Sequence, residues 1–165
     1  MRQHRLATLL LAAAAAIIAS LAVTPAAHAE SPIVKLVSKA NGKCLQPAGN
    51  AALDLIIQMP CTGVVAQQWT QESVNSTSFR LRNRASGLCM EVREGAFNGA
   101  TVDQWLCTNI TNVRWGYGIS NDLLGSGISG SSSHCVATPG SQDGLPVGLR
   151  FCDGNSTQRW SHLPG

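Results

Sequence analysis

Glu91 and Asp103 are the first candidates for chemistry in this chain, because a pair of carboxyl groups is what a glycosidase uses. Nothing in the sequence indicates the deep cleft or the raised pKa that such a pair needs. Nucleophile motifs such as G-x-S-x-G are absent. Beyond the leader described below, only His134 and His162 remain as histidines, too few for a metal site if the cysteines form disulfides. The sequence therefore predicts no enzyme, no metal and no cofactor.

The first 29 residues have the pattern of a secretory leader. Residues 1–5 are cationic, residues 9–23 are apolar and rich in alanine, and Ala27-His28-Ala29 supplies the small side chains that a signal peptidase requires. The apolar run is short for a membrane span, and no basic cluster follows it. We expect cleavage after Ala29 and a secreted mature chain, residues 30–165, without membrane attachment.

The mature chain is close to neutral. Two of the twelve Lys and Arg residues leave with the leader, so ten remain against nine Asp and Glu residues. This balance gives no electrostatic basis for binding nucleic acid or an anionic membrane. Arg80, Arg82 and Arg84 alternate along a predicted strand and so share one face. A solvated outer face is the more common meaning of such a stripe, and a patch for a polyanion is the alternative.

Cysteine and tryptophan recur with one period. The first cysteines of the units are 45 and 46 residues apart, the second cysteines 46 and 45, and Trp69, Trp115 and Trp160 likewise 46 and 45. An even number of cysteines in an exported chain indicates three disulfides. Only one pairing respects the repeat, namely Cys44–Cys61, Cys89–Cys107 and Cys135–Cys152.

Each unit also follows one order of elements. An alternating run such as residues 79–82 precedes a turn, Asn41-Gly42 or Ser86-Gly87, and a strand that opens with the first cysteine follows. No sustained helical period occurs. Strands recur with turn signals every 8–12 residues or so, which favours an all-β sandwich or barrel.

Three units, each with a cysteine pair and a Q-x-W ending, resemble the ricin B-type lectin domain over residues 33–163. The motif is intact in Gln67-Gln68-Trp69 and Gln158-Arg159-Trp160 and degenerate in Val113-Arg114-Trp115. The resemblance implies a β-trefoil with units at approximately 33–76, 77–120 and 121–163. It allows one shallow sugar pocket in each unit.

The tryptophans of the repeat, Trp69, Trp115 and Trp160, occupy one equivalent position, so each is expected to close the core of its unit. Gln67 and Gln158 are expected to brace their units by hydrogen bonds. Val113 cannot form such bonds, so the second unit is expected to lack this brace.

Trp105 falls outside the repeat, two residues before Cys107. In the family this position holds an aromatic platform on which a sugar ring stacks, while hydroxyls need polar partners beside the ring. The alternative is an edge tryptophan that covers the barrel rim. The resemblance places further sugar contacts two residues after the first cysteine, two before the platform and just ahead of Q-x-W. It therefore predicts a carbohydrate site made of Glu91, Asp103, Trp105 and Asn112.

The first and third units lack this set. Their residues at the four positions are Gln46, Ile57, Met59 and Ala66 in the first unit, and Ala137, Gly148, Arg150 and Thr157 in the third. The sequence thus favours a secreted, non-enzymatic carbohydrate-binding module with one sugar site. The alternative is a β-trefoil without sugar sites that binds a secreted partner protein, for example as a protease inhibitor, and the two degraded pockets favour it.

Overall fold

The structure is a computed structural model that describes residues 30–117, 122–128 and 133–165. The predicted signal peptide, residues 1–29, lies outside these residues, so its cleavage stays a prediction. Within the described part of the chain, no helix has the length and apolar character needed to cross a membrane.

Twelve strands, four in each unit, form the described structure, and no α-helix occurs within it. The first unit contains β1 (Ile33–Ser38), β2 (Cys44–Pro47), β3 (Ile56–Met59) and β4 (Trp69–Ser73). The second contains β5 (Phe79–Asn83), β6 (Cys89–Val92), β7 (Val102–Trp105) and β8 (Trp115–Tyr117). The third contains β9 (Leu124–Ser126), β10 (His134–Ala137), β11 (Gly148–Phe151) and β12 (Trp160–Pro164). A single 3-10 turn precedes the last strand of each unit: η1 (Val65–Gln67), η2 (Thr111–Val113) and η3 (Ser156–Gln158).

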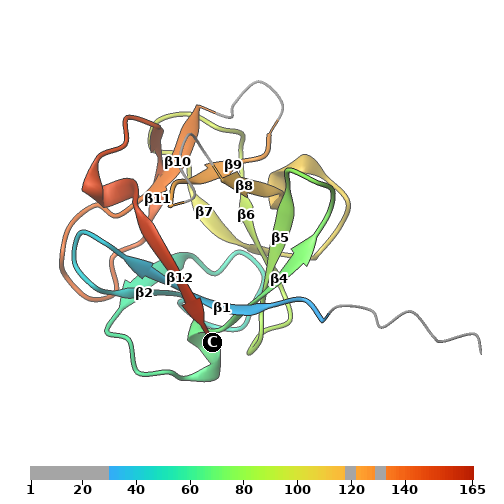
Figure 1. The fold of residues 1–165 in the computed structure, drawn as a ribbon, viewed down its shortest axis with the longest axis horizontal. Coiled ribbons are helices and arrows are strands. Elements are labelled where there is room, and N and C mark those ends of the chain that lie inside the picture. The colour runs from blue at the N-terminus through green and yellow to red at the C-terminus, as the bar shows by residue number, and fades with distance from the viewer. Residues whose placement is uncertain (1–29, 118–121, 129–132) are drawn as a thin grey trace, which may run out of the picture.

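Six strands close into a barrel. Antiparallel pairing runs from β12 to β1, β4, β5, β8 and β9. A bridge between Leu123 and Arg159 joins the β9 side to the β12 side and completes the circle. Figure 1 shows β12 beside β1, which brings the beginning and the end of the described domain together.

The other six strands form three hairpins, β2–β3, β6–β7 and β10–β11. Single bridges connect each hairpin to the other two, at Leu55–Asp103, Ile57–Pro146 and Thr101–Gly148. A six-stranded barrel with a ring of three hairpins is the β-trefoil, so this prediction is confirmed.

The three repeated tryptophans are completely buried. Each starts the last strand of its unit, and its indole Nε1 donates to the carbonyl that directly follows the first cysteine of the same unit. The bonds join Trp69 to Leu45 at 3.1 Å, Trp115 to Met90 at 2.9 Å and Trp160 to Val136 at 3.0 Å. The tryptophan therefore ties the barrel to the hairpin of its own unit.

The three predicted disulfides are confirmed. They link Cys44 to Cys61, Cys89 to Cys107 and Cys135 to Cys152. Each begins at the first residue, or in β10 the second residue, of the first hairpin strand. Each ends in the segment that follows the second hairpin strand. The disulfide and the tryptophan therefore hold every hairpin at two points.

Replacement of a core tryptophan by phenylalanine keeps an apolar ring but leaves a buried carbonyl without its donor. We expect Trp69→Phe, Trp115→Phe and Trp160→Phe each to lower the free energy of unfolding by about 2–4 kcal/mol. Trp105→Phe is the matched control, because Trp105 is only partly buried, and it should cost less than about 1 kcal/mol. Urea unfolding of the oxidised protein measures these differences, and an equal loss at all four positions would contradict the assignment.

Candidate functional site

The β6–β7 hairpin brings together three of the four predicted sugar-binding residues. Glu91 lies opposite Asp103 in the strand register, and Cys89 lies opposite Trp105. Since side chains alternate along a strand, Glu91, Asp103 and Trp105 share one face of the hairpin. The fourth residue, Asn112, comes from η2.

These side chains differ in their access to solvent. Trp105 is partly exposed, whereas Glu91 is 5% exposed and Asp103 is completely buried. The indole is therefore the part of the predicted set that a ligand reaches first, and the carboxyl groups lie beneath the surface.

Arg93 belongs to the same cluster, although the resemblance did not include it. Its guanidinium forms an ion pair with Asp103 Oδ2, and its Nη2 donates to the carbonyl of Leu53 at 3.1 Å. The Arg93 side chain is 37% exposed and lies above a carboxylate with no exposure at all. Strand alternation could have found Arg93, because it lies two residues beyond Glu91 and four beyond Cys89.

Burial and the facing carboxyl group change the protonation of Glu91. The pKa of Glu91 is raised to about 7, first by burial, then by the charge of Asp103 and by a hydrogen bond with it, while Arg93 lowers it. Burial also raises the pKa of Asp103, and Arg93 opposes that rise. Asp103 Oδ1 is buried and has no hydrogen-bond donor among the described residues. The raised pKa favours the neutral form of Glu91 beside it. The cluster is therefore a neutral Glu91 beside an Asp103–Arg93 ion pair at mildly acidic pH.

Asn112 contacts the same strand from outside. Its Nδ2 donates to the carbonyl of Val92 at 3.0 Å and lies 3.5 Å from the carbonyl of Arg93. The amide nitrogen is thus engaged within the protein, and Asn112 positions η2 against the end of β6.

In the first unit, Gln46 occupies the position of Glu91 and is hydrogen-bonded to another residue of the protein. Gln46 Oε1 accepts from Gln67 Nε2 at 3.0 Å. Gln67 also binds the loop after the second cysteine: its Oε1 accepts from the amides of Thr62 and Gly63 at 2.9 and 3.1 Å. Gln46 therefore extends the hydrogen-bond network through which Gln67 braces the first unit.

Gln158 forms the same contacts in the third unit. Its Oε1 accepts from the amides of Asp153 and Gly154 at 3.0 and 3.3 Å, and its Nε2 donates to the carbonyl of Phe151 at 2.6 Å. Val113 is buried at this position of the second unit and has no polar group to offer.

In the second unit, two arginines bind the loop that follows the second cysteine. Arg114 Nη2 donates to the carbonyl and the Oδ1 of Asn109 at 2.9 and 3.0 Å, and Arg80 Nη1 donates to the carbonyl of Thr108 at 3.2 Å. The middle residue of Q-x-W binds this loop in every unit, since Gln68 donates to the carbonyl of Gly63 and Arg159 donates to the carbonyl of Gly154. The resemblance did not assign this role, because the middle position is variable in residue type.

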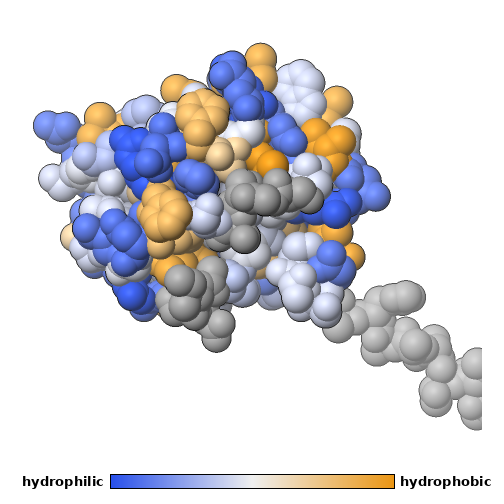
Figure 2. Space-filling view, turned by 90° about the horizontal axis from the view of Figure 1, so that it is seen from above, coloured by the Kyte–Doolittle hydropathy of each residue, from blue (hydrophilic) through white to orange (hydrophobic). Residues whose placement is uncertain are grey.

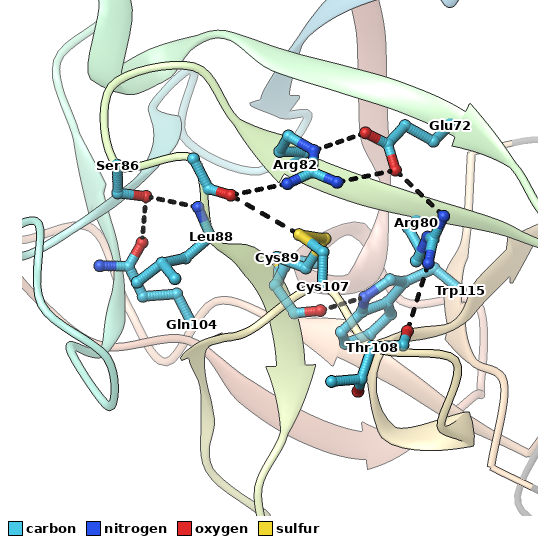
Figure 3. The surroundings of a disulfide bond; sticks show 12 residues. Glu72, Arg80, Arg82, Ser86, Leu88, Cys89, Gln104, Cys107, Thr108 and Trp115 are labelled. Carbon is cyan, nitrogen blue, oxygen red and sulfur yellow. Dashed lines mark hydrogen bonds and ion pairs between the residues drawn. A yellow bond between two sulfur atoms is a disulfide. The ribbon is translucent and has the colours of Figure 1, made fainter.

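Arg80 and Arg82 of the arginine stripe lie in β5, Arg84 directly follows Asn83 at its end, and the stripe is largely paired, as Figure 3 shows for Arg80 and Arg82. Glu72 lies between these two side chains, with Oε2 at 3.3 Å from Arg80 and Oε1 at 2.5 Å from Arg82. Arg84 donates to Gln68 Oε1 at 2.5 Å. These contacts favour a solvated outer face over a site for a polyanion.

Protonation of Glu91 makes the stability of the protein depend on pH. A raised pKa means that its contribution is complete below about pH 4.5 and is lost as the pH rises through about 7. We expect Glu91→Gln to be more stable than the natural protein at pH 8 and to lose that advantage below pH 5. The difference should change by at most about 1.4 kcal/mol per pH unit.

Thermal and urea unfolding at pH 4.5, 6, 7 and 8 measure this difference, with Glu94→Gln as the control at an exposed position in the segment that follows β6. Other titrating groups, such as His162, whose pKa burial lowers, cancel in the comparison. A difference that stays constant across this range would show that Glu91 titrates normally.

The described residues contain no group of three His, Cys, Asp or Glu side chains placed to hold a metal ion.

No curated protein sequence matches the chain. Solved structures do resemble it, including a designed protein with threefold symmetry, ThreeFoil, with a TM-score of 0.75 and 23% identity over 81% of this chain and 99% of that one.

Two further similar structures are natural proteins. The C-terminal half of an earthworm R-type lectin, solved in complex with GalNAc, has a TM-score of 0.63 and 13% identity over 81% of this chain and 99% of that chain. An exo-β-1,3-galactanase from Clostridium thermocellum has a TM-score of 0.75 and 21% identity, over 82% of this chain but only 31% of the enzyme. Identities this low establish the shared fold alone.

A family comparison provides the assignment. The family of the ricin-type β-trefoil lectin domain matches residues 32–160, which include strands β1 to β11 and the first residue of β12. Together with the three disulfides and the buried tryptophans, this match shows that the chain belongs to the ricin-type β-trefoil lectin family.

Proposed function

We propose that the protein is a secreted, non-enzymatic carbohydrate-binding module whose sugar site lies around Trp105 on the β6–β7 hairpin. Membership of the lectin family supports carbohydrate binding in general. The observation that carries the location is Trp105: three of the four tryptophans are completely buried, whereas this one is partly exposed on the face that carries Glu91 and Asp103.

The indole offers a flat apolar surface to the C–H groups of a pyranose ring. Arg93 is the exposed polar group closest to the carboxylates, and its guanidinium can donate to adjacent sugar hydroxyls while it keeps the ion pair with Asp103. Glu91 and Asp103 lie beneath Arg93, and Asp103 orients its guanidinium through the ion pair. A single shallow site of this kind binds weakly, with a Kd on the order of millimolar to tens of micromolar.

Geometry argues against glycoside hydrolysis. The raised pKa of Glu91 is a property of glycosidase acids. Glycosidase carboxyl groups, however, flank the scissile bond at separations of about 5–9.5 Å. Glu91 and Asp103 face each other across β6 and β7 and are 5% and 0% exposed, so a glycosidic bond has no access to the space between them.

A protein partner is the second candidate, and the internal pairing of the polar residues favours it. Arg93 satisfies Asp103, and Asn112 is engaged with the backbone of β6. On the face shown in Figure 2, apolar side chains occur in small groups separated by polar ones, without a broad apolar area for docking. We therefore place this candidate second.

Removal of the indole tests the sugar site. We expect the mature chain to bind at least one glycan class on an array, and Trp105→Ala to weaken that binding by about tenfold or more, because the stacking surface is lost. Trp105→Phe should retain part of the binding.

Phe151→Ala is the matched control, since Phe151 is an exposed aromatic in β11 of the third unit, outside the β6–β7 hairpin. All variants must show the melting temperature of the natural protein. Binding unchanged in Trp105→Ala would place the site elsewhere, and inhibition of a protease without binding of any glycan would favour the protein partner.

A further inference from the structure

The third unit has a cavity where the second unit has its charged cluster. The repeat aligns Glu91 with Ala137, Arg93 with Pro139 and Asp103 with Gly148. These three replacements remove three polar side chains, two of them almost completely buried, from one position of the fold.

A cavity of about 240 Å³ lies there, between the β10–β11 hairpin and the segment that precedes β7. Its lining includes all three of the smaller residues, Ala137, Pro139 and Gly148. Hydrogen bonds fix the two walls to each other: the Gly99 amide donates to the carbonyl of Leu149 at 2.8 Å, and the Leu149 amide donates to the carbonyl of Ala100 at 3.0 Å. The cavity is therefore preformed, because backbone hydrogen bonds fix the position of its walls.

Among the described residues that line this cavity, Arg150 alone is charged. It occupies the position that Trp105 has in the second unit, and it is exposed. Its one hydrogen bond within the described residues is long, from Nη1 to the carbonyl of the adjacent Leu149 at 3.4 Å.

The other arginines differ from Arg150. Each of the other six in the described residues forms an ion pair or a hydrogen bond with the side chain of another residue, namely Arg80, Arg82, Arg84, Arg93, Arg114 and Arg159. Arg150 thus places an uncompensated guanidinium at a preformed cavity, and a guanidinium binds a carboxylate in bidentate fashion.

The rest of the lining suits a sugar ring. Pro139, Pro146 and Leu55 offer apolar surface for C–H groups, and Thr101 and Thr138 bring hydroxyl groups. The volume lies below the range of about 300–1,000 Å³ that is typical of sites for drug-sized ligands, so it fits one ring. Neutral sugars find no carboxylate acceptor here, because Ala137 and Gly148 replace both acidic residues.

We propose that this cavity binds a hexuronate residue, with the sugar carboxylate on Arg150 and the ring against the proline walls. The proposal rests on the proposed carbohydrate-binding function for the class of ligand, but it uses a different unit and the opposite charge. The protein would then have two unlike sites, one for a neutral ring on the second unit and one for an acidic ring on the third.

Chemical-shift titration of the ¹⁵N-labelled mature chain tests this, at pH 7 and low salt. The probes are the methyl glycosides of galacturonate and glucuronate, with the matching galactosides and glucosides as neutral controls. We expect saturable shifts at residues 99–101, 137–139 and 146–150 with a uronate, and binding at least about tenfold weaker with the neutral glycosides.

Arg150→Gln should weaken uronate binding by about tenfold or more, Arg150→Lys should retain part of it, and Arg84→Gln, at an exposed arginine of another unit, should leave it unchanged. Equal binding of uronate by the natural protein and Arg150→Gln would overturn the proposal. Equal binding of acetate, methyl sulfate and the uronates would show a site for anions in general and would overturn the sugar assignment.

Trp105→Ala separates this proposal from the previous one. Uronate binding that survives in Trp105→Ala but not in Arg150→Gln supports the third-unit cavity, whatever happens to neutral glycans. Binding of neutral glycans that requires Trp105, with no binding of uronates, would leave the proposed function standing and would refute the cavity site.

Discussion

Each unit contains one fully buried indole, and a buried N–H must find an acceptor. In all three units the acceptor is the carbonyl that follows the first cysteine, so the last barrel strand is tied to the first hairpin strand of the same unit. The adjacent disulfide links the start of the first hairpin strand to the segment that follows the second. Because the indoles and the carbonyls that they bind are buried, the outward face of a hairpin can change its residues without loss of the scaffold.

The three hairpins show how far this freedom extends. At one equivalent position Glu91 is buried opposite a second carboxyl group, Gln46 extends a structural brace, and Ala137 leaves empty space. The same backbone thus supports a charged cluster, a neutral network and a cavity. Function in this fold is therefore a property of single units.

The structural roles of the cysteines and of the repeated tryptophans were predictable, because the spacing of these residues is long, regular and independent of local propensity. The disulfide pairing and the β-trefoil followed from that spacing and from the resemblance. Arg93 was missed because the resemblance supplies only the positions that the family uses for sugar. The raised pKa of Glu91 was missed for another reason: it depends on how deeply a side chain is buried beside its neighbour, and residue type alone does not determine this depth.

The pairing of β12 with β1 has a consequence for how the chain could be rearranged. Five residue pairs, from Val34–Pro164 to Ser38–Trp160, place the beginning of the domain next to its end. Every disulfide and every indole bond lies within one unit. A circular permutation that joins these ends and opens the chain between β4 and β5 would therefore break no covalent crosslink and no indole bond. Because all these crosslinks lie within single units, a whole unit can be duplicated or exchanged without breaking them.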